Sequence, residues 1–189
     1  PLPRIGIAAA VCVLTSAAVR PAPVPIDAAP GPIFVWIAPG AGVAGWSADD
    51  AVQARRALAA WSGIVPAVRF ALTDDSADAP VHVVWVSRFA DARTGEARVA
   101  RDHGGVVTGA TIALAMRHAD GRPVAGDALR ALAMHEVGHL LGLQHSLNPR
   151  SIMAPVVRVR ALAPEDSAAL RRAFATEGLD QPAGDPRSG

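Results

Sequence analysis

The chain has 189 residues, of which 51% are hydrophobic and 19% are charged, so it can bury one ordinary core and is expected to form a single folded domain. Its formal net charge is only +1 and it contains no long basic run, which excludes a typical nucleic-acid-binding surface. The only cysteine is Cys12, which lies in an apolar amino-terminal stretch, so no disulfide framework is expected within the domain.

The amino-terminal part differs in composition from the rest. Arg4 precedes an apolar stretch over residues 5–19, and a proline-rich segment follows over residues 20–32. The apolar stretch is shorter than the roughly 20 residues that a bilayer-spanning helix needs. It therefore predicts a secretory signal peptide over residues 1–19, a linker over residues 20–32, and a secreted, extracellular protein. The alternative is an uncleaved membrane anchor in residues 5–19, which would attach the protein to the cell envelope.

The first expected elements of the domain are a strand and a helix. Residues 33–37 are β-branched and aromatic, which favours a strand, and a glycine-rich loop follows. Ser47 is a good N-cap, and the acidic residues after it suit the positive end of a helix dipole. We expect this helix to bury an apolar face that comprises Val52, Leu58, Ala59 and Trp61.

Further strands are expected next. Residues 68–72 and 81–86 are apolar runs bounded by turn residues, which is typical of strands. Residues 96–101 and 106–116, joined by a turn at residues 102–105, predict a hairpin. We expect this hairpin to form the edge of the sheet that borders the functional site.

Two more helices complete the domain. Asp127 begins the first of them, and its core positions are expected at Leu129, Leu132, Ala133, Val137, Leu140 and Leu141. The last helix is expected to begin near Pro164, because proline is tolerated in the first helical turn. The domain as a whole is expected over residues 33–176, with a disordered tail over residues 177–189.

The most specific pattern in the chain is HEVGHLLGLQH, which begins at His135. His135 and His139 are four residues apart, so on a helix they share a face and both can bind one metal ion. Gly142 lets the chain leave the helix, because glycine adopts the left-handed conformation without steric cost, and His145 can then return as a third ligand. Three histidines with an open fourth position predict a catalytic zinc ion, with Glu136 beside it as the proton acceptor.

The extended spacing H-E-x-x-H-x-x-G-x-x-H, followed by the segment S-I-M-A-P from Ser151 to Pro155, resembles the metzincin zinc proteases. Because the chain contains no tyrosine, the astacin-like and serralysin-like members are disfavoured, and the proline two residues after Met153 is similar to the matrixin family. The resemblance extends over residues 33–176. It implies an α+β catalytic domain with a twisted mixed sheet of about five strands and three helices, in which one helix carries the HExxH motif.

The resemblance also implies roles for residues around the zinc ion. Met153 would form an apolar floor beneath the histidines, and Gly142 and Pro155 would be structural residues of the same site. Asp166 matches a carboxylate of the closing helix that supports the methionine turn, and its alternative role is to interact with the helix dipole. A second, structural zinc ion or a calcium ion has no supporting motif, since the spacing around His103 and His118 departs from the family pattern.

Together these features predict a monomeric, secreted zinc endopeptidase that acts on protein or peptide substrates by Glu136-assisted attack of zinc-bound water. An inactive zinc-binding module and a zinc hydrolase of non-peptide amides are the alternatives. The segment over residues 155–162 would form the wall of the pocket for the residue that follows the cut. Its valines favour a hydrophobic residue there, whereas Arg158 or Arg160, if directed into the pocket, would favour an acidic one.

Overall fold

A computed structural model describes residues 31–103 and 107–177 of the chain. One sheet is formed by β1 (Ile33–Ile37), β2 (Phe70–Leu72), β3 (Val81–Val86), β4 (Gly95–Arg101) and β5 (Val107–Ala115). The α-helices in this part of the chain are α1 (Ala48–Trp61), α2 (Asp127–Leu140) and α3 (Pro164–Glu177), and a short 3-10 helix covers Ser76–Asp78. This five-stranded sheet with three α-helices confirms the α+β architecture expected from the sequence.

The sheet is mixed, and its strand order is β2-β1-β3-β5-β4. The β1–β2, β1–β3 and β3–β5 pairs are parallel, whereas β4 pairs with β5 in the antiparallel direction. A register shift between Ala100 and Arg101 marks a bulge in this last pair. β4 is thus an edge strand of the described sheet, as the hairpin prediction required.

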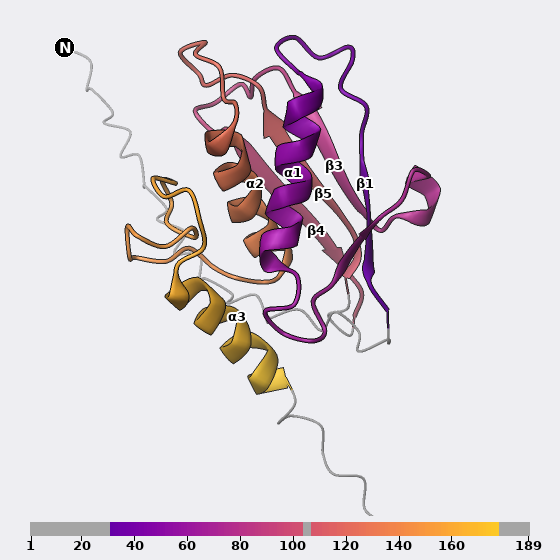
Figure 1. Ribbon diagram of the computed structural model, residues 1–189, viewed down its shortest axis with the longest axis vertical. Helices are drawn as coiled ribbons and strands as arrows, with labels where there is room; N and C mark the ends of the chain where they lie inside the picture. Colours follow the sequence, from indigo (N-terminus) through magenta and orange to yellow (C-terminus); the bar gives the residue numbers. More distant parts are fainter. Residues whose placement is uncertain (1–30, 104–106, 178–189) are drawn as a thin grey trace, which may run out of the picture.

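Helices α1 and α2 lie side by side on one face of the sheet (Figure 1). Alternate side chains of a strand point towards these helices. In β3, Val81, Val83 and Trp85 are buried, while the residues between them are half-buried. The indole N–H of Trp61, at the end of α1, donates to the carbonyl oxygen of Met134 in α2 at 2.9 Å. Packing and this hydrogen bond together hold α2 against the sheet and against α1.

Two details of the sequence prediction were wrong. The buried face of α1 comprises Ala54, Ala57, Leu58 and Trp61, whereas Ala59 is exposed and Val52 is only half-buried. Ala59 lies one residue beyond Leu58, which rotates its side chain by about 100° away from the core. The second strand begins at Phe70 rather than residue 68, because the amide of Val68 donates to the carbonyl of Val65 in a turn.

Other expected elements have nearly the predicted bounds. The helix that follows Ser47 begins as predicted, and the Ser47 amide donates to the Asp50 carboxylate at 2.7 Å. The predicted signal peptide and linker, the tail after Glu177 and half of the hairpin turn lie outside the described residues. Within residues 31–103 and 107–177, no helix combines the length and the apolar character that a membrane crossing requires.

Candidate metal centre

Two of the predicted metal ligands project from the carboxyl-terminal half of α2. His135 and His139 are one helical turn apart, and their rings meet edge to face with centroids 4.7 Å apart. His135 is buried, whereas His139 is half-buried. The apolar residues expected at core positions of α2 are all buried, so the helix cannot rotate without exposing them: Leu129, Leu132, Ala133, Val137 and Leu140.

Gly142 brings the third histidine to the other two. Its φ of +85° lies in the left-handed region, where a residue with a side chain would be strained. The Gly142 amide donates to the carbonyl of His139 at 3.0 Å, and the Leu143 amide donates to that of Gly138 at 2.9 Å, so the helix ends here and the chain reverses. As a result the Nε2 atom of His145 lies 3.2 Å from that of His139.

Hydrogen bonds at the Nδ1 atoms fix the tautomers of His135 and His139. Nδ1 of His135 lies 2.8 Å from the carbonyl oxygen of Ile152, and Nδ1 of His139 lies 2.9 Å from that of Leu143. A carbonyl oxygen can only accept, so each Nδ1 carries the proton and each Nε2 presents a lone pair. This is the tautomer that binds a metal ion through Nε2.

The three Nε2 atoms converge on one point. Those of His135 and His139 are 3.1 Å apart, close to the separation of about 3.3 Å expected for two imidazoles on a tetrahedral zinc ion. Lone pairs that face one another at this distance repel unless a cation lies between them. Among the described residues, these three histidines are the only group of three or more potential ligands close enough to share an ion. The donor set therefore fits zinc.

The protonation of the histidines favours the same conclusion. The pKa of His135 is lowered to about 4, mainly by burial and also by the neighbouring His139 and His145, whereas the hydrogen bond that the ring donates to the Ile152 carbonyl opposes this shift. Burial also lowers the pKa of His139. Both rings are thus neutral at neutral pH, so a metal ion does not have to displace a proton from either of them.

Met153 lies against α2 at Gly138, the residue that precedes His139. Its side chain is buried, and its sulfur occupies the space where a Cβ on Gly138 would be. The amide of Ser146, next to His145, donates to the Met153 carbonyl at 2.8 Å and joins the third histidine to this turn. Gly138 was not singled out from the sequence, although a glycine inside a helix costs about 1 kcal/mol and so indicates close packing.

Gly138→Ala should therefore destabilise the protein by about 1–2 kcal/mol, because the added methyl group displaces the Met153 side chain from a packed position. The better helix propensity of alanine offsets part of this cost. Urea denaturation measures the change in the free energy of unfolding. In the Met153→Ala background the same substitution should cost less, since the space is then free, and equal costs in both backgrounds would contradict the contact.

The turn that contains Met153 is held by Asp166, near the start of α3. Asp166 is 2% exposed, and its carboxylate accepts hydrogen bonds from the Ser151 hydroxyl and from the Ile152 amide, the latter at 3.0 Å. It also accepts from the amide of Ala163 at 2.7 Å, which caps the first turn of α3. Asp166 thus links α3 to the residue whose carbonyl orients His135.

The histidines lie in a cleft of about 660 Å³. Residues 92–97, at the start of β4, line one wall, and α2 contributes Leu132, Glu136 and the two helical histidines. The segment after the methionine turn contributes Pro155, Val156, Val157 and Arg160 to the lining. The cleft therefore combines a metal-ligand cluster, a carboxyl group and an edge strand.

Glu136 is buried in this cleft and has an unusual pKa. Its side chain packs so closely against Gly95 that a Cβ at that position would overlap the carboxylate. Burial raises the pKa of Glu136 to about 7, and the negative charge of Glu96 acts in the same direction. The backbone amide of Ala97 donates to the carboxylate and partly opposes this shift. Gly95 was not singled out from the sequence, which carries no signal for this long-range contact.

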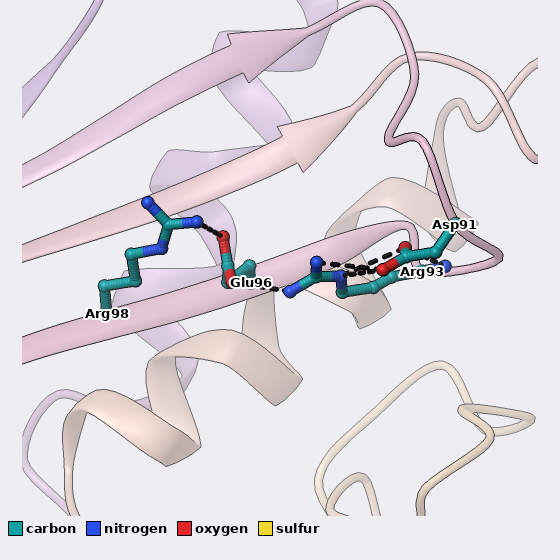
Figure 2. A network of polar contacts seen from close by, with 4 residues as sticks. All are labelled: Asp91, Arg93, Glu96 and Arg98. Atoms are coloured by element: carbon teal, nitrogen blue, oxygen red, sulfur yellow. Dashed lines mark hydrogen bonds and ion pairs between the residues drawn. The ribbon is translucent and has the colours of Figure 1, made fainter.

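A four-residue ion-pair network at the rim of the cleft was also missed (Figure 2). Glu96 lies between two guanidinium groups, 2.5 Å from Nη1 of Arg93 and 2.9 Å from Nη2 of Arg98. Asp91 pairs with the same Arg93 at 2.8 Å. Two acidic and two basic residues thus neutralise one another along this wall.

The remaining histidines of the described residues do not join the three-histidine group. His82 is half-buried in β3, with Nε2 3.0 Å from the carbonyl oxygen of Ser76 and its ring against Trp36, so it has a structural position away from the cleft. His103 is exposed, and His118 lines the cleft without joining the three-histidine group.

Comparison with known proteins agrees with this geometry. The chain is 60% identical over 30 residues to human matrix metalloproteinase-15, a match that covers 16% of this chain and 4% of that much longer protein. The model of the matrixin peptidase family matches residues 46–174. This range includes α1, strands β2 to β5, the three histidines and most of α3. Since this match extends over about two thirds of the sequence, the chain belongs to the matrixin family.

Proposed function

We propose that this chain is a secreted zinc-dependent metalloendopeptidase that hydrolyses internal peptide bonds. The observation that carries the proposal is the convergence of three Nε2 atoms beside a buried glutamate, in a cleft bordered by an edge strand. Membership of the matrixin family supports metalloprotease activity on proteins or peptides. The apolar segment over residues 5–19 supports secretion.

Each residue of the site has a defined task in this proposal. His135, His139 and His145 would hold zinc through Nε2, with Met153 and Gly142 maintaining their arrangement. When bound there, zinc lowers the pKa of water to about 7 and polarises a carbonyl group. Glu136 lies in the cleft beside the histidines, where its carboxylate can accept the proton of the attacking water and deliver it to the leaving amine.

The substrate is positioned by backbone groups of β4. An edge strand has unpaired amides and carbonyls along one side, so an extended peptide can add to the sheet as a further strand. This places the peptide along the wall formed by residues 92–97, beside Glu136 and the histidines. An extended peptide bound through its backbone is cut internally, which favours endoproteolysis over the removal of terminal residues.

The direct test uses the full-length chain and a mixed peptide library. The zinc-loaded protein should cut peptides at internal bonds, lose this activity in a chelator and regain it when zinc is added. Mass spectrometry of the products identifies the cleaved bonds. Removal of terminal residues alone would contradict the endopeptidase assignment, and hydrolysis restricted to non-peptide amides would identify a different hydrolase.

A matched pair of histidine variants controls for the metal site. His145→Ala should lower zinc affinity by about 100-fold or more, because it removes one of three ligands. His103→Ala should leave the affinity unchanged, since this exposed residue lies outside the cluster. Equal losses in the two variants would mean that the third ligand is wrongly assigned. Zinc binding without hydrolysis of any peptide would identify an inactive module.

A further inference from the structure

The two arginines of the segment after the methionine turn differ in position. Arg160 lines the cleft together with Val156 and Val157. Arg158 is exposed and is not among the residues that line it. The sequence placed both in the same segment without distinguishing them, because a loop has no periodicity that fixes side-chain direction. The structure assigns only Arg160 to the cleft.

The charge of Arg160 is not neutralised by any ion pair within the described residues. Its guanidinium donates to the carbonyl oxygen of the adjacent Val159 at 3.2 Å, which leaves most of its five N–H donors available. The side chain is exposed to the cleft rather than packed in the core. An arginine in such a position is suited to bind a carboxylate from a ligand.

The acidic residues of the cleft are committed to other partners. Glu96, which also lines the cleft, is held between Arg93 and Arg98, and its side chain is only 19% exposed (Figure 2). Glu136 is buried against Gly95. Neither carboxylate is therefore available to Arg160, and the ion-pair network of Asp91, Arg93, Glu96 and Arg98 carries no net negative charge that would repel an acidic substrate.

We propose that Arg160 makes the enzyme prefer substrates with an acidic residue, in particular glutamate, directly after the scissile bond. This inference deepens the proposed endopeptidase function and rests on it. Val156 and Val157 provide an apolar surface for the methylene groups of the glutamate, and its carboxylate pairs with the Arg160 guanidinium. A longer acidic side chain thus fits the wall better than a purely hydrophobic one of similar length.

Paired peptides that differ only in glutamate or glutamine after the cut test this proposal with the zinc-loaded full-length chain. Glutamine has nearly the same shape, so the ratio of the two kcat/KM values reports the charge alone. We expect the glutamate peptide to be preferred by about three- to tenfold at low salt, as for a partly exposed ion pair. In about 1 M salt the preference should fall towards one, because the screening length is then about 3 Å.

Variants of the two arginines identify the residue responsible. Arg160→Gln should bring the glutamate-to-glutamine ratio to about one, and Arg160→Glu should favour lysine over glutamine at the same position. Arg158→Gln is the matched control and should keep the wild-type ratio, since this side chain lies outside the cleft. Zinc content checks that each variant is folded at the site.

The outcomes separate this proposal from the proposed function. If the wild-type protein cuts both peptides equally, or if Arg160→Gln keeps the preference, the role of Arg160 is wrong while the endopeptidase assignment stands. If the preference is lost in Arg158→Gln instead, the wrong arginine has been assigned. Absence of internal cleavage in any peptide, despite bound zinc, would instead overturn the proposed function.

Discussion

Glu136→Gln should reduce kcat/KM for peptide hydrolysis by about 10²–10⁴-fold while zinc content stays at the wild-type level. The carboxyl group lies in the cleft beside the histidines but outside the group of three that converges on one point. Glutamine has almost the same volume and its oxygen can still accept from the Ala97 amide, but it cannot take up a proton. A fluorogenic peptide assay and metal analysis measure the two quantities. Loss of zinc in this variant would place Glu136 among the ligands instead.

Although Glu136→Gln should lose activity, we expect it to be more stable than the wild type in the absence of metal. A gain in stability would show that the loss of activity is not caused by unfolding. Without metal, the pKa of Glu136 rises from 4.5 to about 7 on folding, so the folded protein holds a proton that the unfolded chain has released between these pH values. The free energy of unfolding therefore falls as pH rises through this window. Glutamine does not titrate, so in a chelator the variant should gain on the order of 3 kcal/mol over the wild type between pH 4 and pH 8. A constant difference across this range would contradict the raised pKa.

Local signals were sufficient to predict most of the fold. The alternation of buried and half-buried residues in β3 follows directly from the sequence VHVVWV, and the Ser47 cap correctly gave the start of α1. The spacing of the histidines and the glycine at position 142 predicted how three ligands would meet, because helix geometry and a left-handed turn leave few other arrangements. These are properties of short segments, which the sequence records directly.

Contacts between segments that are distant in the chain could not be predicted from the sequence. Gly95 and Glu136 are 41 positions apart and meet only because β4 is placed beside α2. The separation of Arg158 from Arg160 depends on the path of a loop with no regular period. Ala59 is apolar and small, so composition alone did not show that it lies on the exposed side of α1. In each case the missing information is the tertiary packing that decides which side chains meet.

The role of Asp166 depends on one peptide unit that connects α3 to the metal centre. The amide of Ile152 donates to the Asp166 carboxylate at 3.0 Å, and the carbonyl of the same residue accepts from Nδ1 of His135 at 2.8 Å. Asp166 therefore fixes the backbone segment that holds the His135 ring in its orientation. Its charge near the start of α3 also suits the helix dipole, so the two roles expected from the sequence coexist in its position.

Asp166→Ala should separate these roles, with an expected loss of about 3–4 kcal/mol in the free energy of unfolding. The substitution leaves the buried Ser151 hydroxyl and Ile152 amide without their acceptor, which costs far more than a dipole interaction of about 0.3–1 kcal/mol. Zinc affinity should also fall by about 10–100-fold, because the acceptor that orients His135 is no longer fixed. Glu165→Ala removes the same charge from the same helical turn, together with an exposed hydrogen bond from the Asn148 side chain, and should cost no more than about 1 kcal/mol, without a change in zinc affinity. Denaturation and zinc titration of both variants measure these effects, and similar small losses in the two would show that Asp166 acts only on the helix dipole.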